Sequence, residues 1–274
     1  MNNFAINQKK NISLLINLGN HCVFALIALI AIGSATRVME AGLACPDWPL
    51  CYGTLLPLDK MNLRIFLEWF HRLDAFFVGT LILCQFILSI VWKKYLPNWL
   101  PKIYSILVFL IILQGSLGAL TVIKLLDSIT VMSHLLIAFL ILITSIFTNQ
   151  IIAIKNSYTP PMWWRIMLSV PLSLTLFQSL IGVRLSSTWA AHLCLSFNNQ
   201  CILLDIHKLF VIPLALSFIA IFFVSIFKKH LFIKNCKFLI SLIIFFVGQI
   251  SLGFLSLKTN LTQPFLMVSH QIFA

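Results

Sequence analysis

Residues 64–92 have the sequence RIFLEWFHRLDAFFVGTLILCQFILSIVW, an apolar run long enough to cross a bilayer as one helix. His71 lies seven residues after the first residue of this run, Arg64. A histidine inside a membrane helix is costly, so it marks a candidate functional site by default. The stretch therefore predicts a helical membrane protein and points to histidine as the residue that carries its function.

Composition extends this prediction to the whole chain. The 274 residues are 60% hydrophobic and only 9% charged, with a mean hydropathy of +1.01. Such values are typical of a polytopic membrane protein, whose first partner is the lipid bilayer, and exclude an ordinary soluble domain. The net charge of +12 does not indicate nucleic-acid binding, because the basic residues form short clusters between apolar runs.

The apolar runs predict seven spanning helices and the start of an eighth. They cover 12–36, 64–92, 103–123, 129–154, 163–185, 202–227 and 236–257, and the eighth begins near residue 264 and is truncated by the chain end. Most lysines of the connections lie on the same side as Lys9 and Lys10, so the positive-inside rule predicts a cytoplasmic N-terminus. We expect a multi-pass protein of a bacterial inner (cell) membrane.

Two close cysteine pairs lie in connections on the opposite, outer side of the predicted topology. The first pair is Cys45 and Cys51, and the second is Cys194 and Cys201. Close pairs suit disulfides if their compartment is oxidising. The first pair is either a structural disulfide or a redox-active one, whereas we expect the second to be structural.

Four histidines form two copies of one pair. His71 and His134 are 63 residues apart, as are His207 and His270, and each copy lies 136 residues beyond its counterpart. Each histidine follows the predicted outer end of its helix by six or seven residues, which corresponds to about 9–10 Å of helix. Histidines at one depth on facing helices can ligate one planar cofactor, and haem iron accepts an axial imidazole on each face.

The two halves of the chain match beyond the histidines. Gln114-x-x-Leu117-Gly118 corresponds to Gln249-x-x-Leu252-Gly253; these stretches either pack helices closely or let a porphyrin approach the backbone. Each unit has an even number of helices, so we expect two tandem four-helix transmembrane bundles related by a parallel pseudo-two-fold repeat. The fold class is all-α, with an N-terminal domain at 1–155 and a C-terminal domain at 156–274.

The halves differ beside the first histidine. Glu68 lies three residues before His71, whereas Leu204 holds the same position before His207. A carboxylate one turn from a ligand lies on the same helix face, so we expect the reactive site in the first half. Glu68 alternatively forms a structural ion pair with Arg64 or Arg72.

Four basic residues lie near the outer helix ends. Each either snorkels to the interface or pairs with a haem propionate. They are Arg37, Arg72, Arg184 and Lys208.

The run Gly42-Leu-Ala-Cys-Pro-Asp-Trp-Pro-Leu-Cys-Tyr-Gly53, followed by Glu68-x-x-His71-Arg72, closely resembles the haem A synthase (CtaA/Cox15) family, of the bacterial type with a cysteine pair. The resemblance covers nearly the whole chain. It implies an oxidoreductase that converts the C8 methyl of haem O to a formyl group, giving haem A for terminal oxidases. It also implies that His207 and His270 hold haem b, that His71 and His134 bind the substrate, and that Glu68 is the catalytic carboxylate.

In this family the Cys45–Cys51 pair is associated with electron or thiol chemistry in a subset of members. The family has a complete eighth helix, whereas this chain stops four residues after His270. Either the sequence is truncated or the second haem site is altered. The expected partners are haem O, a haem O synthase and an electron acceptor, and the sequence leaves a homo-oligomer open. The rival functions are a non-catalytic dihaem b-type electron-transfer protein and a transporter with a histidine proton relay.

Overall fold

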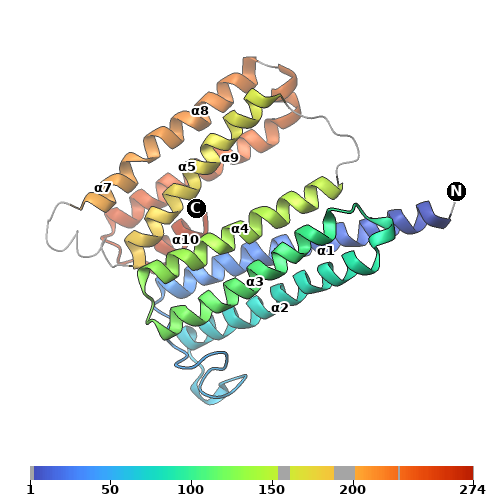
Figure 1. Cartoon of the computed structure of the whole chain (residues 1–274). Helices are drawn as coiled ribbons and strands as arrows, with labels where there is room; N and C mark the ends of the chain where they lie inside the picture. The colour runs from blue at the N-terminus through green and yellow to red at the C-terminus, as the bar shows by residue number, and fades with distance from the viewer. Residues whose placement is uncertain (1–2, 154–160, 188–200, 228, 274) are drawn as a thin grey trace. The chain divides into compact units, whose positions relative to one another are not determined.

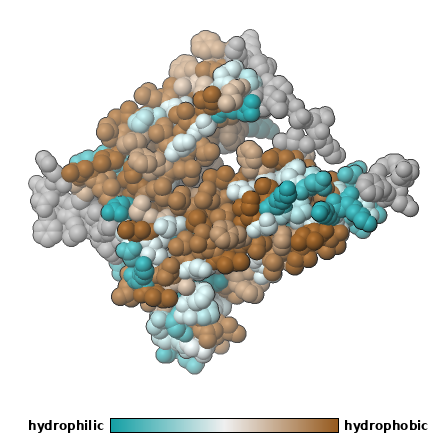
Figure 2. Space-filling model, in the orientation of Figure 1, coloured by the Kyte–Doolittle hydropathy of each residue, from teal (hydrophilic) through white to brown (hydrophobic). Residues whose placement is uncertain are grey.

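The computed structural model describes residues 3–153, 161–187, 201–227 and 229–273. Seven helices in these ranges are long and apolar enough to cross a membrane, which confirms the predicted all-α polytopic fold. Large apolar side chains such as Phe76, Phe109 and Phe147 are more than half exposed. In Figure 2 apolar residues cover most of the visible face, and hydrophilic residues gather at the start of α1 and on the loop before α2.

The chain separates into two compact units, Met1–Ser157 and Tyr158–Ala274, and each is described by itself. In unit 1, α1 contacts α2 and α4, and α3 contacts the same two helices, so the four form a closed ring (Figure 1). The elements of unit 1 are α1 (Asn3–Val38), η1 (Leu58–Lys60), α2 (Leu63–Val91), η2 (Lys93–Tyr95), α3 (Leu100–Ile123) and α4 (Ser128–Ala153).

Side-chain caps fix the start of the two helices that carry histidines in unit 1. The Asn62 side chain accepts a hydrogen bond from the Ile65 backbone N–H at 3.1 Å, where α2 begins. Asp127 Oδ2 accepts bonds from the backbone N–H and the hydroxyl of Thr130, both at 3.1 Å, where α4 begins. These N-caps satisfy donors that a helix start leaves without partners, so they set the register of the residues that follow.

The buried apolar core of unit 1 stops short of the histidines. On the two helices that carry the histidines, the first core residues are Val78 on α2 and Ile141 on α4, each seven residues beyond the histidine of the same helix. The core comprises Leu15, Cys22, Leu26, Val78, Ile82, Leu96, Leu100, Tyr104, Leu107 and Ile141. The fully buried hydrocarbon therefore fills the part of the bundle away from the histidines, two helical turns below their level.

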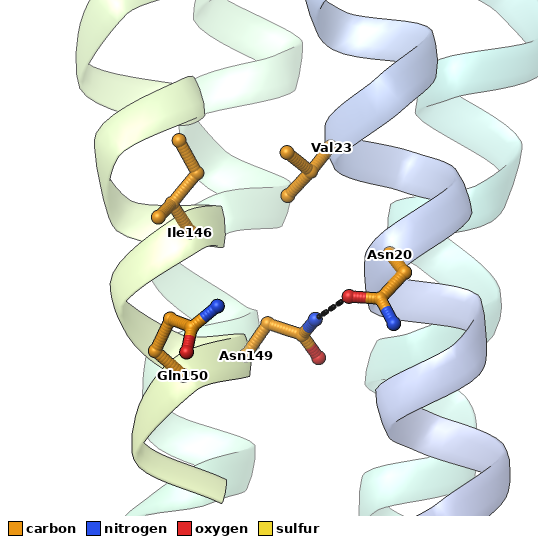
Figure 3. A pocket seen from close by; sticks show the side chains of 5 residues that line it. All are labelled: Asn20, Val23, Ile146, Asn149 and Gln150. Carbon is orange, nitrogen blue, oxygen red and sulfur yellow. Dashed lines mark hydrogen bonds between the residues drawn. The ribbon is translucent and has the colours of Figure 1, made fainter. Parts of the chain in front are cut away.

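A polar contact joins α1 to α4 within the bundle (Figure 3). The Asn149 side-chain amide donates to Asn20 Oδ1 at 2.7 Å, and Gly19 lies directly against the same Asn149 side chain. A cavity of about 70 Å³ opens beside this pair. Because a water needs only about 15 Å³ of such volume, the cavity suits water and is far too small for a macrocyclic cofactor.

In unit 2, α5 packs against α7 and α8, α8 packs against α9, and α9 packs against α10. The elements are α5 (Met162–Ser187), α7 (Ile202–Leu209), α8 (Val211–Phe227), α9 (Lys229–Lys258) and α10 (Pro264–Phe273). The helix predicted over 202–227 is thus interrupted at Phe210. Pro213 has no N–H to donate to the Leu209 carbonyl, and this missing bond explains the break.

The same turn closes α3 and α9. The Leu126 N–H donates to Thr121 O at 2.7 Å, and the Leu261 N–H donates to Ser256 O at 2.9 Å. In both turns the bond joins a residue of positive φ to one five positions earlier, as in a Schellman motif. The parallel repeat of the two halves remains a prediction, and this local match supports it.

Candidate functional site

Each of the four predicted histidines lies against a glycine on a neighbouring helix. A Cβ built on the glycine would meet imidazole Cε1 first in every case. The distances to Cε1 would be 2.9 Å for Gly33 (α1) and His71 (α2), 3.3 Å for Gly118 (α3) and His134 (α4), 3.3 Å for Gly182 (α5) and His207 (α7), and 2.8 Å for Gly253 (α9) and His270 (α10). The four imidazoles therefore share one mode of packing.

At His270, the backbone carbonyl one helical turn before the facing glycine lies close to imidazole Nδ1. His270 Nδ1 lies 3.1 Å from the carbonyl oxygen of Gln249. The carbonyls of Leu29 and Gln114 lie beside the His71 and His134 rings, although neither Nδ1 forms a well-aligned hydrogen bond. Assigning the proton to Nδ1 leaves Nε2 as a free lone pair, the tautomer that suits a metal ligand.

The same tautomer decides the direction of the hydrogen bond between Gln114 and His134. The Gln114 side-chain amide lies 3.2 Å from His134 Nε2, and with Nδ1 protonated the amide N–H donates to Nε2. The lone pair that this hydrogen bond uses is the one that would bind iron. Gln178, at the equivalent place on α5, instead donates to the His207 backbone carbonyl at 2.7 Å.

The His207 and His270 rings lie close together in unit 2. The two ring centroids are 6.4 Å apart, and the ring planes are inclined by 84°. Two imidazoles that bind one metal from opposite sides, each nitrogen about 2 Å from it, have centroids about 6 Å apart. The donor type and the spacing therefore fit a haem iron.

In unit 1, His71 and His134 each lie against a glycine of a neighbouring helix, Gly33 and Gly118. They lie between the apolar core, two turns away, and a buried polar cluster beneath the loop before α2. The described residues contain no cluster of three or more histidine, cysteine or acidic side chains that could hold a metal ion.

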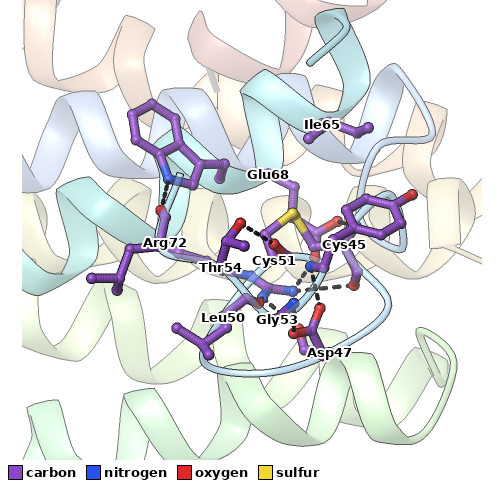
Figure 4. The surroundings of a disulfide bond; sticks show 12 residues. Cys45, Asp47, Leu50, Cys51, Gly53, Thr54, Ile65, Glu68 and Arg72 are labelled. Carbon is purple, nitrogen blue, oxygen red and sulfur yellow. Dashed lines mark hydrogen bonds and ion pairs between the residues drawn. A yellow bond between two sulfur atoms is a disulfide. The ribbon is translucent and has the colours of Figure 1, made fainter. Parts of the chain in front are cut away.

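Glu68 is buried, with 4% of its surface exposed, and both of its carboxylate oxygens have partners (Figure 4). Oε2 accepts the backbone N–H of Cys45 at 2.7 Å, and Oε1 pairs with Arg72. Of the two structural partners that the sequence left open, Arg72 is therefore the observed one. Arg64 instead lies 3.7 Å from Glu40, and both of these side chains are largely exposed.

Arg72 ties the loop before α2 to the helix. Its Nη1 donates to the carbonyl oxygens of Asp47, at 2.6 Å, and Leu50, and its Nη2 reaches Cys45 O at 3.4 Å as well as Glu68. These contacts engage both terminal nitrogens of Arg72 within the protein. Its expected role toward a propionate remains a prediction, as do those of half-buried Arg37 and of Arg184 and Lys208, which are exposed.

The predicted Cys45–Cys51 disulfide is present, and both cysteines are buried. Asp47 closes the loop between them by accepting the backbone N–H groups of Tyr52, at 2.6 Å, and Gly53, at 2.7 Å. The Gly53 N–H is the main cause that holds the pKa of Asp47 below its ordinary value. Sequence reasoning did not single out this carboxylate.

Of the second predicted cysteine pair, Cys201 is disulfide-bonded, and Cys194 lies outside the described residues. Sequence reasoning also missed Gly33 and Gly182. A signal for Gly182 exists, because Gln178-x-x-x-Gly182 repeats the spacing of Gln114 to Gly118. In α1 the glutamine position holds Leu29, so the pattern there is reduced to the glycine.

Three comparisons with known proteins bear on this arrangement. The Heme A synthase of Shewanella oneidensis is 38% identical over 133 residues, which are 43% of this chain and 39% of that protein. The Heme A synthase of Rhodopseudomonas palustris is 26% identical over 202 residues, 59% of this chain and 56% of that protein. A segment of 62 residues, 23% of this chain, is 36% identical to 13% of the Protoheme IX farnesyltransferase of Haloarcula marismortui.

Each of these matches spans less than two thirds of the relative's own length. The model of the COX15-CtaA family, described as cytochrome oxidase assembly protein, matches residues 18–274. That match runs through both units and contains all four histidines, the four facing glycines and the Cys45–Cys51 loop. As its sequence motifs predicted, the chain is therefore a multi-pass membrane protein that belongs to the COX15-CtaA family.

Proposed function

We propose that this protein is a haem A synthase that oxidises the C8 methyl group of haem O to a formyl group. Membership of the COX15-CtaA family and the similarity to proteins named Heme A synthase support the proposal. The observation that carries it is the common packing of four membrane histidines in two pairs, one pair with the spacing of axial ligands. The conversion removes four electrons from the methyl carbon and adds one oxygen atom, so it needs an electron acceptor.

The two units would bind different haems. His207 and His270 would hold haem b, which supplies one-electron redox chemistry when bound. Imidazole Nε2 would be the ligand atom, and the Nδ1–H···O=C contact that His270 makes with Gln249 would fix the ring. His71 and His134 would hold haem O in unit 1, at the level where the apolar core ends.

Glu68 would accept a proton during the oxidation. It lies three residues before His71, is buried, and is held by Arg72 and the Cys45 N–H. This anchoring fixes the carboxylate against the disulfide loop, one helical turn from His71. The same contacts make Glu68 part of the loop support, so the test must separate a loss of chemistry from a loss of structure.

The partners follow from the substrate. One segment resembles a Protoheme IX farnesyltransferase, and an enzyme of that kind would deliver a farnesylated haem within the membrane. The further proposal is a bacterial inner membrane location with a cytoplasmic N-terminus, which places the disulfide loop outside.

The test is to express the chain with a supply of haem O and to identify the haems extracted from the purified protein. We expect haem A from the unchanged chain and little or none from His71→Leu. Glu68→Gln keeps an oxygen acceptor for the Cys45 N–H, so we expect it to retain the disulfide and bound haem while haem A formation falls. Normal haem A from Glu68→Gln would refute the proton role.

The rival electron-transfer function makes a different prediction. A non-catalytic dihaem protein would show the absorption spectrum of a bis-imidazole haem but would form no haem A under any supply of substrate. A chain that contains haem b in unit 2 and leaves haem O unchanged would therefore favour the rival. Absence of any haem absorption would contradict both functions.

A further inference from the structure

The four glycines that face the histidines lie inside helices, where glycine is a poor choice. None of them has a positive φ; of the described glycines only Gly53 does. Glycine in a helix interior is destabilising relative to alanine because it leaves more backbone freedom to lose on folding. Backbone conformation therefore does not explain these residues, and at these four positions the lack of a side chain is what admits the neighbouring histidine.

At each contact, the absence of a glycine side chain leaves space for the edge of an imidazole ring. A Cβ on Gly253 would lie 2.8 Å from His270 Cε1, 3.2 Å from Nδ1 and 3.4 Å from Nε2. The first distance is shorter than atoms at this kind of contact tolerate, so the ring would have to move. Movement would break the hydrogen bond from Nδ1 to the Gln249 carbonyl and turn Nε2 away from its present direction.

We propose that Gly33, Gly118, Gly182 and Gly253 are positioning residues that set the direction of each imidazole and so determine how the iron is held. The inference rests on the proposed function and deepens it. Each glycine admits the ring edge, the neighbouring backbone carbonyl orients Nδ1 where it is in reach, and Nε2 is aimed at the metal. The glycines touch neither the iron nor the reacting carbon; they act through the histidines.

The four contacts differ in how closely the ring approaches the glycine. Gly33 and Gly253 hold their rings at 2.9 and 2.8 Å, whereas Gly118 and Gly182 hold theirs at 3.3 Å. A neighbour at 3.3 Å can accommodate a methyl group by yielding a few tenths of an ångström, whereas a neighbour at 2.8 Å must move farther. Each unit therefore contains one histidine that an added methyl group would displace more and one that it would displace less.

The test compares Gly253→Ala with Gly248→Ala on the same helix, where nothing lies within 4 Å of the added methyl group. The full chain is purified in detergent, and haem content, spin state and midpoint potential are measured. We expect Gly253→Ala to lose haem affinity about tenfold or more, the range seen when groups that orient metal ligands are removed, and to shift from a low-spin to a high-spin spectrum. Gly248→Ala should match the unchanged protein.

Added free imidazole separates positioning from general damage. If the haem pocket is intact and only His270 is misdirected, imidazole should restore the low-spin spectrum of Gly253→Ala. The milder Gly182→Ala should keep its haem and change only the midpoint potential. If Gly253→Ala and Gly248→Ala have the same spectrum, affinity and potential, the inference is wrong.

Unit 1 offers a second pair if Gly253→Ala does not accumulate. The Cβ of Gly33→Ala would lie 2.9 Å from His71 Cε1, whereas Gly115→Ala in the same unit meets nothing within 4 Å. Purified protein is titrated with haem, and Gly33→Ala should bind more weakly than Gly115→Ala; equal binding overturns the inference. An unchanged chain that binds no haem would instead refute the proposed function, so the two failures are distinguishable.

Discussion

Replacing Arg72 by lysine keeps the positive charge but removes the planar fork that holds the disulfide loop. Arg72 reaches the carbonyls of Asp47, Leu50 and Cys45 as well as Glu68, and its side chain is only 15% exposed. A lysine ammonium is a single compact donor on a flexible stem, so it cannot span these acceptors. At least one loop carbonyl would then be left without a partner.

The size of the effect follows from that loss. Leaving a buried acceptor without a hydrogen bond costs about 1–3 kcal/mol, so we expect Arg72→Lys to lower the free energy of unfolding by about 2 kcal/mol. Arg64→Lys on the same helix is the matched control. Its 3.7 Å pair with Glu40 is 60% and 49% exposed, and such pairs contribute less than about 1 kcal/mol, so the control should change little.

The assay is denaturant unfolding in detergent, extended to a double-mutant cycle with Glu68→Gln. Hydrogen bonds to charged groups contribute about 1.5–3 kcal/mol, so the coupling energy between the two positions should exceed about 1 kcal/mol. Additivity within about 0.5 kcal/mol would show that the pair does not act as a unit. The reasoning would also fail if Arg72→Lys were no more destabilising than Arg64→Lys.

Three further predictions concern the loop and the α1–α4 contact. The Gly53 N–H lowers the pKa of Asp47 in the folded loop. The stability that Asp47 gives is therefore complete above its ordinary pKa and is lost as the pH falls through the lower folded value. Proteolysis of the loop should accelerate only below about pH 4, and Asp47→Asn should remove this pH dependence. Cys51→Ser should lower the free energy of unfolding by about 2 kcal/mol, since the disulfide closes a short loop of sequence separation 6. Because Cys201 is also disulfide-bonded, a reductant should lower the melting temperature of the variant as well, but by less than that of the unchanged chain. Gly19→Ala should destabilise unit 1, because its methyl group meets the Asn149 side chain, and a second change, Asn149→Ala, should restore the melting temperature; an additive loss would contradict the contact.

The spanning helices were predictable because their signal is local. Each apolar run has the length that the bilayer requires, and most helix ends lie within three residues of the predicted ones. The exceptions are the starts of α1 at Asn3 and of α9 at Lys229, which precede the predicted runs at 12 and 236. The interruption at Phe210 was not predicted, although Pro213 carries the physical reason for it. The disulfide at Cys45–Cys51 was also predictable, since two cysteines so close in one connection have few other partners within reach.

The sequence by itself determined the seven apolar spans, and it predicted that each of four histidines lies six or seven residues from the outer end of its helix. These properties depend on hydropathy and on helical rise, which a linear pattern contains. Only the tertiary structure decided which arginine pairs with Glu68 and which atoms meet at Gly33 and Gly182. Such contacts join helices through space, and they depend on the rotation of each helix about its axis, which spacing along the chain does not fix.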